Sequence, residues 1–480
     1  MSSLRAKLLG GFFWSFMQRV GVVLVSFISN ILLARMLMPS DYGCIGMLMI
    51  FIALSNTFID GGFGSALIQK KEPTQAYYST IFFWNLFLSV VLYGLLYMAA
   101  PLIARFYHID LLISVLRVQG LVLIINALGL VQQNILRKRL LFKNIAFIKI
   151  SASVLSLFVA AYLAYHGYGV WALVAQQLSW SCIATFLYWV SRVWYPSWVF
   201  SMQSFKELFH FGGFILLANL VTTFTDNLQG IIIGRLFTPA TMGLYTQARR
   251  LEEAVATTLS SVVDQVSYPV FAEVQENKER LLLVVRKIIT VSAYVCFPVM
   301  FLLMLVAEPI IAMLYLEKWL ACVPYFRILC VAGLMTCIYN LNYFAVAAVG
   351  RSKSLFRLNI LQSVISIVLM LLGVYWKGMH GLLWGMVLGI YTNYVLYAVL
   401  SAKIVGYKLL QQFLDLLPIA LVGALTSLLV GYIAEFLHGH TLVVLALQVL
   451  LFGGIYVGVS MLMQLQATQW LKELVRTMRK

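Results

Sequence analysis

The chain has 480 residues, of which 62% are hydrophobic and 11% are charged, and its mean hydropathy is +0.92. A soluble globular domain carries about 25% charged residues, so the composition excludes such a domain and predicts a polytopic membrane protein. The formal net charge of +17 does not indicate nucleic-acid binding, because the basic residues lie in short segments between apolar runs, as membrane topology requires.

Apolar runs of about 20 residues, the length that spans the hydrocarbon core, recur from one end of the chain to the other. We predict an all-α polytopic membrane protein with about fourteen transmembrane helices. The expected spans are residues 10–36, 42–68, 76–100, 111–135, 143–165, 168–190, 208–236, 242–270, 284–307, 321–348, 355–375, 380–402, 409–434 and 441–464. The first span is interpreted as a retained helix, because no small-residue cleavage site stands out after the short basic start.

The lysines and arginines between the spans are distributed unequally. One set of alternating connections holds roughly 23 of them, and the opposite set holds about 5, counting Arg35 and Arg235 at helix ends. Cytoplasmic loops carry the excess of basic residues. The sequence therefore predicts that both termini are cytoplasmic, as an even number of spans requires.

One segment occurs twice, 200 residues apart. Residues 31–43 read ILLARMLMPSDYG, and residues 231–243 read IIIGRLFTPATMG. The identical positions are Ile31, Arg35, Pro39 and Gly43 in the first copy and Ile231, Arg235, Pro239 and Gly243 in the second. A duplicated half is the usual architecture of a transporter. The repeated arginines and prolines themselves are interpreted as helix-end structure.

The two copies begin at the first and seventh spans, so both halves enter the membrane in the same direction. Halves of this kind are parallel repeats about a pseudo-two-fold axis along the membrane normal. We expect a six-helix bundle over residues 1–200, a second over 201–407, and two further transmembrane helices with a cytoplasmic tail over 408–480. Arg117 and Arg327 match in place, because each opens the fourth span of its half.

Few ionisable residues fall within the expected spans. A charge at the bilayer centre costs at least about 2.5–3.5 kcal/mol, so such residues usually face a cavity or a partner. Arginine binds phosphate bidentately and stays charged. We therefore predict a cavity for an anionic substrate lined by Arg19, Arg249 and Arg250. The carboxylates, which are candidates for ion coupling or for charge pairs, are Asp60, Asp226, Glu252, Glu253 and Asp264.

These charges also have structural interpretations, which stay open at this point. Arg19 and Asp60 lie at similar depths on neighbouring spans, where a salt bridge or a shared cavity is expected. Arg249 and Glu253 are four residues apart and share a helix face, so they can neutralise each other and let the helix insert. Asp264 lies near the expected cytoplasmic end of its span, which fits an interfacial position.

Motifs for catalysis and metal binding are missing from the sequence. It has no Walker A, HExxH or GxSxG motif and no paired CxxC. We therefore expect no enzyme and no cofactor, and transport coupled to H⁺, Na⁺ or the membrane potential. The six cysteines lack metal-ligand spacing. His438 and His440 belong to an HGH segment that is interpreted as an exposed loop, so no metal site is expected.

Three segments resemble the polysaccharide and oligosaccharide-lipid flippases of the multidrug/oligosaccharidyl-lipid/polysaccharide exporter superfamily. They are FFWSFMQRVGVVLVSFISNILLARMLMPSDYG at 12–43, FIDGGFGSALIQKKE at 58–72 and MGLYTQARRLEE at 242–253. The sequence looks most like the Wzx-type, colanic-acid-exporter-like branch. The resemblance implies a V-shaped, alternating-access fold of two six-helix bundles.

The resemblance also implies a function. It implies movement of undecaprenyl-pyrophosphate-linked oligosaccharide from the cytoplasmic to the periplasmic leaflet of the bacterial inner membrane, for synthesis of exopolysaccharide, capsule or O-antigen of lipopolysaccharide. The expected partners are membrane lipids and a polysaccharide polymerase or glycosyltransferase complex, with no nucleic acid. Arg19 occupies a place similar to cavity arginines of lipid II flippases, in which the last two helices line a groove for the lipid tail.

Two other functions are weighed against this one. A cation-coupled multidrug antiporter of the same superfamily favours an acidic cavity, whereas arginines here at least match the carboxylates. A membrane scaffold for a polysaccharide synthase does not need buried charges or a twofold repeat. The sequence therefore favours the flippase.

Overall fold

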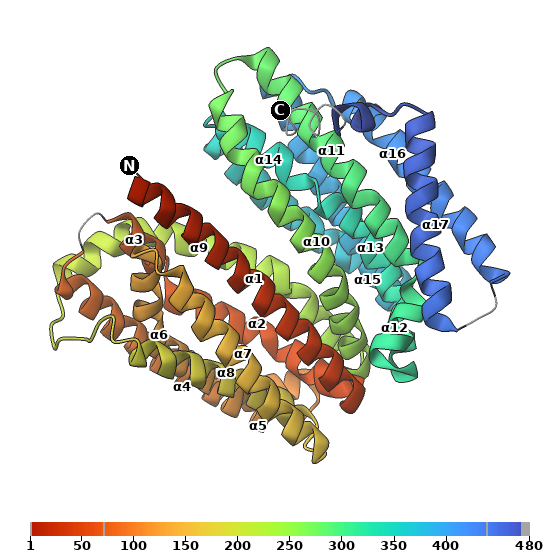
Figure 1. Ribbon diagram of the computed structural model, residues 1–480. Coiled ribbons are helices and arrows are strands. Elements are labelled where there is room, and N and C mark those ends of the chain that lie inside the picture. Colours follow the sequence, from red (N-terminus) through yellow and green to blue (C-terminus); the bar gives the residue numbers. More distant parts are fainter. Residues whose placement is uncertain (1, 71–72, 438–439, 472–480) are drawn as a thin grey trace. The chain divides into compact units, whose positions relative to one another are not determined.

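The structure is a computed structural model that describes residues 2–70, 73–437 and 440–471 (Figure 1). Regular structure within these ranges is helical throughout, so the prediction of an all-α fold is confirmed. His438 of the HGH segment and residues 472–480 of the expected cytoplasmic tail lie outside the described residues.

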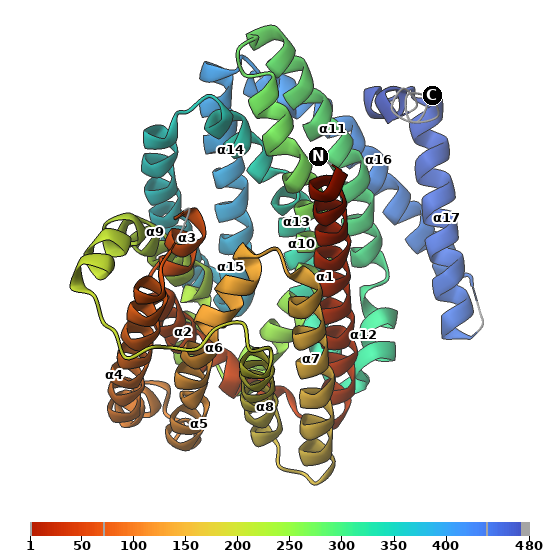
Figure 2. The ribbon, with the colours of Figure 1, turned by 60° about the vertical axis from the view of Figure 1, so that its left-hand side comes forward.

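The first half of the chain forms helices in the expected order. Their bounds are α1 Ser2–Met36, α2 Pro39–Asp60, α3 Phe63–Gln69, α4 Gln75–Tyr107, α5 Leu111–Gln119, α6 Leu121–Lys138, α7 Phe142–Tyr165 and α8 Val170–Val190. Helix α7 packs against both α1 and α8 (Figure 2).

The second half contains ten further helical elements among the described residues. Their bounds are α9 Met202–Leu236, α10 Pro239–Glu273, α11 Lys278–Leu305, α12 Ala307–Tyr315, the 3₁₀ helix η1 Glu317–Cys322, α13 Val323–Thr336, α14 Tyr339–Ala348, α15 Ser352–Ile404, α16 Leu409–Glu435 and α17 Thr441–Leu462. Lys377 and Gly378 inside α15 are non-helical, so α15 consists of two helices joined at a kink. This kink separates the two spans that were expected there.

Eleven segments of the described chain are long and apolar enough to cross a membrane. The protein is therefore a multi-pass membrane protein. Helices α9 and α10 have 35 residues each, but their composition keeps them out of these eleven. The span count of fourteen and the cytoplasmic position of the termini stay predictions.

Two glycines interrupt the span that is predicted over residues 42–68. Helix α2 ends at Asp60, and Gly61 and Gly62 follow with φ of 53° and 70° before α3 begins. Glycine adopts this left-handed conformation without the steric cost that a side chain adds. One continuous helix therefore does not form here, and Asp60 lies at a helix end rather than in the middle of a span.

Several local features of the two halves match. Helices α1 and α9 both have 35 residues and begin 200 residues apart, and each is followed by a helix with proline in its first turn. The turn glycine Gly169 has φ 55° and ψ −128°, and Gly378 has φ 56° and ψ −129°. Arg117 Nε donates to the Tyr97 carbonyl at 3.4 Å, and Arg327 Nε donates to the Met304 carbonyl at 3.3 Å. These local matches support the duplication.

The two copies of the repeated segment pack directly against each other. A Cβ atom added at Gly43 would lie 1.8 Å from the carbonyl oxygen of Pro239, and one added at Gly243 would lie 1.7 Å from that of Pro39. The contact is thus reciprocal, and only the absence of a side chain at both glycines allows the backbones to meet. The repeated Pro–Gly spacing is therefore the crossing point of α2 and α10.

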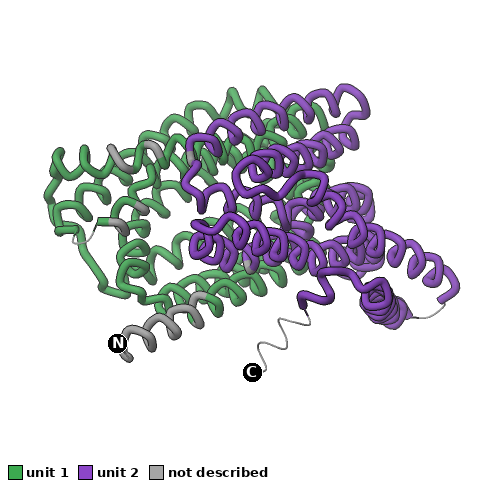
Figure 3. Tube along the Cα trace, turned by 90° about the horizontal axis from the view of Figure 1, so that it is seen from above, with its two compact units in different colours: residues 1–246 green, residues 247–480 purple. Residues whose placement is uncertain are grey.

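Contacts divide the chain into two compact units, residues 1–246 and 247–480 (Figure 3). The division lies after the expected repeat boundary at residues 200 and 201, because α9 packs along α2, α3 and α4. Thr57 and Thr223 bring their hydroxyls to 3.1 Å, and Lys70 Nζ lies 2.7 Å from Glu207 Oε2. The repeat boundary therefore stays a prediction about the sequence duplication, distinct from the compact units.

The segment that links α8 to α9 is fixed to the start of α4. Trp194 Nε1 donates to Gln75 Oε1 at 2.5 Å, Gln75 Nε2 donates to the Tyr195 carbonyl at 2.7 Å, and the Ser201 amide donates to Thr80 Oγ1 at 2.9 Å. Aromatic rings pack around these bonds, including Trp198 stacked on Phe83. The connection is therefore a structured part of the first unit.

Polar contacts attach the last two helices to α11 within the second unit. Arg286 of α11 forms two bonds to Asp415 of α16, at 2.6 and 2.7 Å, and Tyr407 donates to the same carboxylate at 2.6 Å. Tyr456 of α17 donates to the Tyr294 carbonyl of α11 at 3.0 Å. Helices α16 and α17 are therefore attached to the bundle that contains α11.

Candidate functional site

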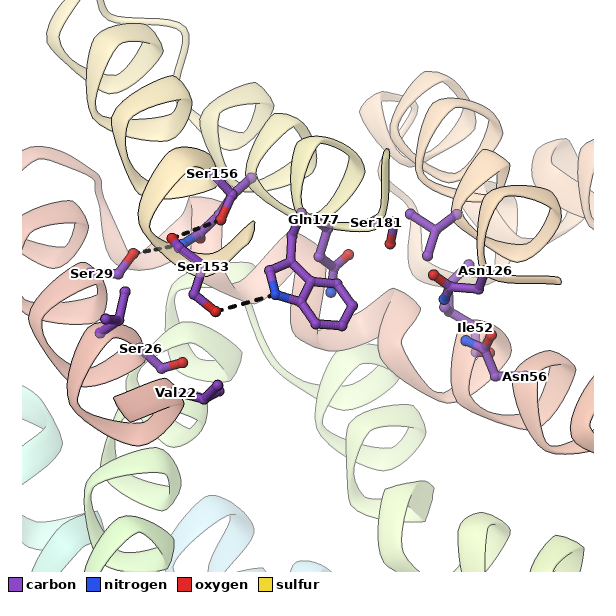
Figure 4. Close-up of a pocket in the computed structure, with 14 residues that line it drawn as sticks. Val22, Ser26, Ser29, Ile52, Asn56, Asn126, Ser153, Ser156, Gln177 and Ser181 are labelled. Carbon is purple, nitrogen blue, oxygen red and sulfur yellow. Dashed lines mark hydrogen bonds between the residues drawn. The ribbon is translucent and has the colours of Figure 1, made fainter. Parts of the chain in front are cut away.

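A polar pocket lies inside the helix bundle of the first unit. It has a volume of about 400 Å³ and is lined by residues of α1, α2, α6, α7 and α8 (Figure 4). The lining residues are Val22, Val25, Ser26, Ser29, Ile52, Asn56, Val122, Asn126, Ser153, Ser156, Gln176, Gln177, Trp180 and Ser181. The lining contains hydroxyl, amide, indole and aliphatic groups and no charged side chain. We call this cavity the polar pocket.

Part of the polar pocket is held by its own hydrogen bonds. Gln176 Nε2 donates to Ser29 Oγ at 2.6 Å, and Trp180 Nε1 donates to Ser153 Oγ at 3.3 Å. Outside the lining, Gln119 Nε2 donates to Gln177 Oε1 at 2.6 Å. These bonds join α1 to α8, α7 to α8, and α5 to α8, so they fix where the polar groups of the wall lie.

Two other residues of the lining, Ser181 and Asn126, form no side-chain hydrogen bond within the described chain. Neither is among its buried polar atoms without a partner, so their polar groups are open to the cavity. The Oε1 atom of Gln119, behind the wall, is buried and without a partner in the described residues. Buried polar groups are normally satisfied by protein, water or ligand. The polar pocket therefore presents open hydrogen-bonding groups to water or to a ligand.

This pocket was not predicted from the sequence, because only ionisable residues within the spans were considered as candidates. The available signal was the density of serine and amide side chains in apolar helices, such as Ser153 with Ser156 and Gln176 with Gln177. Such residues are neutral, and each alone is common in transmembrane helices. Only the packing of five helices shows that they line one cavity.

The predicted charged residues of the first unit do not form the expected pair. Arg19 is exposed on α1, and Asp60 ends α2. No ion pair joins Arg19 to Asp60 in the described part of the structure. The Asp60 carboxylate instead lies beside Gly64 at the start of α3, and the side-chain amide of Asn134 approaches the same glycine. The arginine whose charge acts on Asp60 is Arg137.

The other predicted charge of the first unit, Asp226, is exposed on α9. It lies on a helix surface that also carries exposed polar residues, including Thr222. Within this unit, none of the three predicted charges lines the polar pocket. The charged and the neutral polar residues of the first unit are therefore separate sets.

Most predicted charges of the second unit lie together on α10. Arg249 Nε is 2.5 Å from Glu253 Oε1, which confirms the expected contact on one helix face. Glu252 is 6% exposed, and its Oε1 atom lies 2.9 Å from where a Cβ on Gly333 of α13 would be. Arg250 is exposed. These charges explain why α10 is too polar to be counted with the eleven apolar segments.

Asp264 lies three to four turns further along α10 and has a neutral partner. Its Oδ2 atom accepts a hydrogen bond from Asn340 Nδ2 of α14 at 3.1 Å, whereas its buried Oδ1 atom has no hydrogen-bond partner among the described residues. A carboxylate with a single amide donor is incompletely satisfied. It therefore remains a candidate for an ion contact rather than one half of a salt bridge.

An apolar groove lies between α16 and α17. It has a volume of about 470 Å³ and a lining in which Thr426 is the one polar residue, with Leu417, Pro418, Leu421, Val422, Leu425, Leu429, Ile455, Val459 and Met463. No charged residue occurs in this lining. The groove is thus chemically suited to hydrocarbon, and it lies on the helix pair that the resemblance associates with a lipid tail.

Comparison with known proteins places the chain in a family. A family model described as polysaccharide biosynthesis protein matches residues 32–324, more than half of the chain. The teichuronic acid biosynthesis protein TuaB of Bacillus subtilis (strain 168) is 27% identical over 358 residues, 74% of each chain. The lipopolysaccharide biosynthesis protein WzxC of Escherichia coli (strain K12) is 25% identical over 438 residues, 90% of this chain and 88% of its own.

Solved structures show the same fold. The lipid II flippase MurJ in an inward closed conformation superposes with a TM-score of 0.75 over 94% of this chain and 99% of its own, at 13% identity. An inward-facing multidrug resistance transporter of the MATE family and MOP superfamily gives 0.63 over 82% and 98%, at 18% identity. At sequence identities of 13% and 18%, the similarity shows a shared fold and nothing more. The chain therefore adopts the MurJ- and MATE-like fold and belongs to the polysaccharide biosynthesis protein family.

Proposed function

We propose that the protein moves undecaprenyl-pyrophosphate-linked oligosaccharide from the cytoplasmic to the periplasmic leaflet of a bacterial inner membrane, for synthesis of a surface polysaccharide. The observation that carries the proposal is the family match over residues 32–324 together with the flippase fold over 94% of the chain. The names of TuaB and WzxC connect those relatives with teichuronic acid and lipopolysaccharide biosynthesis. The protein then acts as a transporter and not as an enzyme.

The proposed topology has fourteen spans with both termini in the cytoplasm. The eleven apolar segments become twelve when α15 is counted as two helices, and α9 and α10 bring the number to fourteen. This count agrees with the positive-inside distribution of lysine and arginine. In this arrangement residues 1–200 and 201–407 are parallel repeats, and α16 and α17 are additional.

The charged residues are proposed to act on the anionic part of the substrate. A charged helix in a membrane protein faces a polar environment, because charge in hydrocarbon is costly. Arg19, Arg249 and Arg250 are assigned to the pyrophosphate. The Arg249–Glu253 pair means that an anion binding there must compete with a carboxylate 2.5 Å away. Asp60, Asp226, Glu252 and Asp264 are assigned to ion coupling or charge balance.

The neutral and apolar sites match the other parts of such a substrate. The polar pocket offers hydrogen bonds without charge, and the groove between α16 and α17 offers an apolar lining for a polyprenyl tail. A multidrug antiporter is the second candidate, because the MATE fold also superposes. It is less well supported, since the family match is to polysaccharide biosynthesis and the MurJ superposition covers more of the chain.

The test is a deletion strain in which lipid-linked oligosaccharide is quantified on each leaflet. Deletion is expected to cause accumulation on the cytoplasmic leaflet and loss of surface polysaccharide, and the wild-type gene restores both. Unchanged surface polysaccharide with no accumulation contradicts the flippase. Increased drug sensitivity without a glycan defect supports the antiporter instead.

The arginine assignment has its own test in the same strain. Arg19→Ala and Arg249→Ala are expected to lower export at least about tenfold, since a charge-assisted hydrogen bond contributes about 1.5–3 kcal/mol. Arg139→Ala, an exposed arginine beyond the end of α6, is the matched control and is expected to leave export unchanged. If both test variants reach normal levels in the membrane and export normally, these arginines do not bind the anionic part of the substrate.

A further inference from the structure

We propose that the polar pocket of the first unit is a binding site for an uncharged sugar residue of the transported glycan. The proposal rests on the proposed function, because it names which chemical part of the substrate the pocket takes. It assigns the glycan to a neutral site within one helix bundle and leaves the pyrophosphate to arginines elsewhere in the chain. Three features of the pocket support this assignment: its size, the chemistry of its lining and its open hydrogen-bonding groups.

The size of the polar pocket fits a sugar ring. Ligand pockets typically measure about 300–1,000 Å³, and the polar pocket has a volume of about 400 Å³. A water molecule occupies roughly 30 Å³ of liquid volume, so this cavity exceeds what one or two structural waters fill. The cavity is also too wide for a single dehydrated alkali cation, because the oxygen ligands of such an ion must all lie in direct contact with it.

The chemistry of the lining fits hydroxyl groups rather than phosphate. Serine hydroxyls donate and accept, and asparagine and glutamine amides carry both donors and acceptors, as sugar hydroxyls do. Asn126 and Asn56 lie on one side of the close-up, and Ser26, Ser29 and Ser153 lie on the other (Figure 4). A phosphate placed between them would lose its hydration without meeting any cation of the lining, which is strongly unfavourable.

The open hydrogen-bonding groups of the pocket support a ligand independently of its size. The Ser181 hydroxyl and the Asn126 amide form no hydrogen bond within the described chain and are not among its buried atoms without a partner, so they are available to a ligand in the cavity. Ser29, by contrast, accepts a bond from Gln176 and keeps its own hydroxyl hydrogen available for a ligand oxygen. Ser153 accepts from Trp180 and donates its hydroxyl hydrogen to the Lys149 carbonyl at 2.8 Å, so its hydroxyl is fixed within the wall. The pocket thus combines a serine hydroxyl whose position is fixed, Ser29, with side chains that can both donate to and accept from a ligand.

The side chain of Trp180 adds an apolar surface to the same wall. Its indole nitrogen is engaged by Ser153 at 3.3 Å, and the residue lines the cavity. Aromatic rings present an apolar body beside a polar tip, which matches the C–H face and the hydroxyl edge of a pyranose. Ligand pockets commonly combine such a surface with a few placed polar groups.

The first experiment measures binding to the purified full chain in lipid nanodiscs. Saturation-transfer difference NMR is recorded with the methyl glycosides of glucose, galactose, mannose, rhamnose and N-acetylglucosamine, and with glucose 6-phosphate as the charged comparison. At least one neutral glycoside is expected to give a saturable signal that the phosphate does not share. The absence of a saturable signal from every neutral glycoside overturns the proposal.

The variants of this experiment are chosen to keep the fold. Asn126→Leu and Ser181→Ala each remove one hydrogen-bonding group of the lining, so sugar affinity is expected to fall about 2- to 12-fold for each. Ser179→Ala is the matched control, because its hydroxyl bonds to the Ala175 carbonyl of its own helix and does not line the pocket. Equal affinity of wild type, Asn126→Leu and Ser181→Ala overturns the proposal.

A charge-introducing variant separates a sugar site from a cation site. Asn126→Asp places an unpaired carboxylate in the neutral lining, so it is expected to weaken binding of the neutral glycoside. If the pocket instead holds an alkali cation, the same variant strengthens Na⁺ binding, and Na⁺ raises the unfolding temperature of Asn126→Asp more than that of wild type. That second result, without any glycoside signal, assigns the pocket to a cation and contradicts our inference.

The second experiment distinguishes failure of this inference from failure of the proposed function. In the deletion strain, wild type is expected to clear lipid-linked oligosaccharide from the cytoplasmic leaflet, Ser179→Ala to match it, and Asn126→Leu with Ser181→Ala combined to reduce clearance at least about fivefold. If wild type itself clears nothing, the proposed function fails. If wild type and the combined variant clear it equally, only the sugar assignment of the polar pocket fails.

Discussion

The reciprocal contact at the repeated glycines yields the most direct prediction. Replacing Gly43 by alanine puts a methyl group 1.8 Å from the Pro239 carbonyl oxygen. Real Cβ atoms essentially never approach another heavy atom below 3.0 Å, so α2 and α10 must separate there by at least 3.0 − 1.8 = 1.2 Å. The obstacle is backbone and not a flexible side chain, so rotation of a neighbour cannot relieve it.

The cost of that separation can be bounded. A gap of about 0.5–1 Å already removes a quarter to a half of the dispersion energy of the atoms concerned, and overpacking typically costs 1–3 kcal/mol. We expect Gly43→Ala to destabilise the first unit by about 3 kcal/mol. For a domain of about 150–250 residues this lowers the unfolding temperature by roughly 6–12 °C, at 2–4 °C for each kcal/mol.

The assay is thermal unfolding of the purified protein in detergent, read by tryptophan fluorescence. Gly453→Ala and Gly458→Ala on α17 are the matched controls, because nothing lies within 4 Å of a Cβ at either position. They are expected to leave the unfolding temperature unchanged or to raise it slightly, as alanine favours helix over glycine. An unfolding temperature of Gly43→Ala equal to that of these controls refutes the reasoning.

The reciprocity of the contact gives a sharper version of the test. Gly243→Ala meets the Pro39 carbonyl at 1.7 Å and requires the same two helices to separate. Once one substitution has moved them apart, the second costs less, so the double variant is expected to lose clearly less stability than the sum of the single losses. Additive losses would show that the two glycines act at independent contacts.

Three further predictions concern other contacts. Asp415→Ala removes the two hydrogen bonds of the Arg286 guanidinium and is expected to lower the stability by about 2–3 kcal/mol. This is below the usual cost of breaking a buried pair, because Arg286 is 31% exposed. Arg286→Met combined with Asp415→Leu is expected to recover most of the lost stability, measured by thermal unfolding. A hydrogen bond from Lys70 lowers the pKa of the exposed Glu207 carboxyl below 4.5. The pair therefore stabilises the fold above pH 4.5, and this contribution is lost as the pH falls. Glu207→Gln is expected to make the unfolding temperature less dependent on pH below 4.5. Gly378→Ala forces a side chain to φ 56° and ψ −129° and is expected to cost about 1–3 kcal/mol, whereas an unchanged unfolding temperature contradicts the kink.

Several features of the fold follow from the sequence alone. Long apolar runs cannot leave their backbone groups unpaired in hydrocarbon, so they must be helices, and the structure contains them near the expected places. The duplication was predicted from the segments 31–43 and 231–243, and the equal lengths of α1 and α9 and the matching turns at Gly169 and Gly378 are consistent with it. The pair Arg249–Glu253 was predictable because residues four apart on a helix are neighbours.

Other features were decided only by tertiary structure. Depth along a helix placed Arg19 and Asp60 at similar levels, but pairing also requires that two helix faces meet, and the break at Gly61 turns Asp60 toward α3 instead. The polar pocket is formed by neutral side chains of five helices, each unremarkable in its own segment. A charge within an apolar run is visible in sequence because of its cost in hydrocarbon. The convergence of serines and amides on one cavity is a property of packing, which no single segment contains.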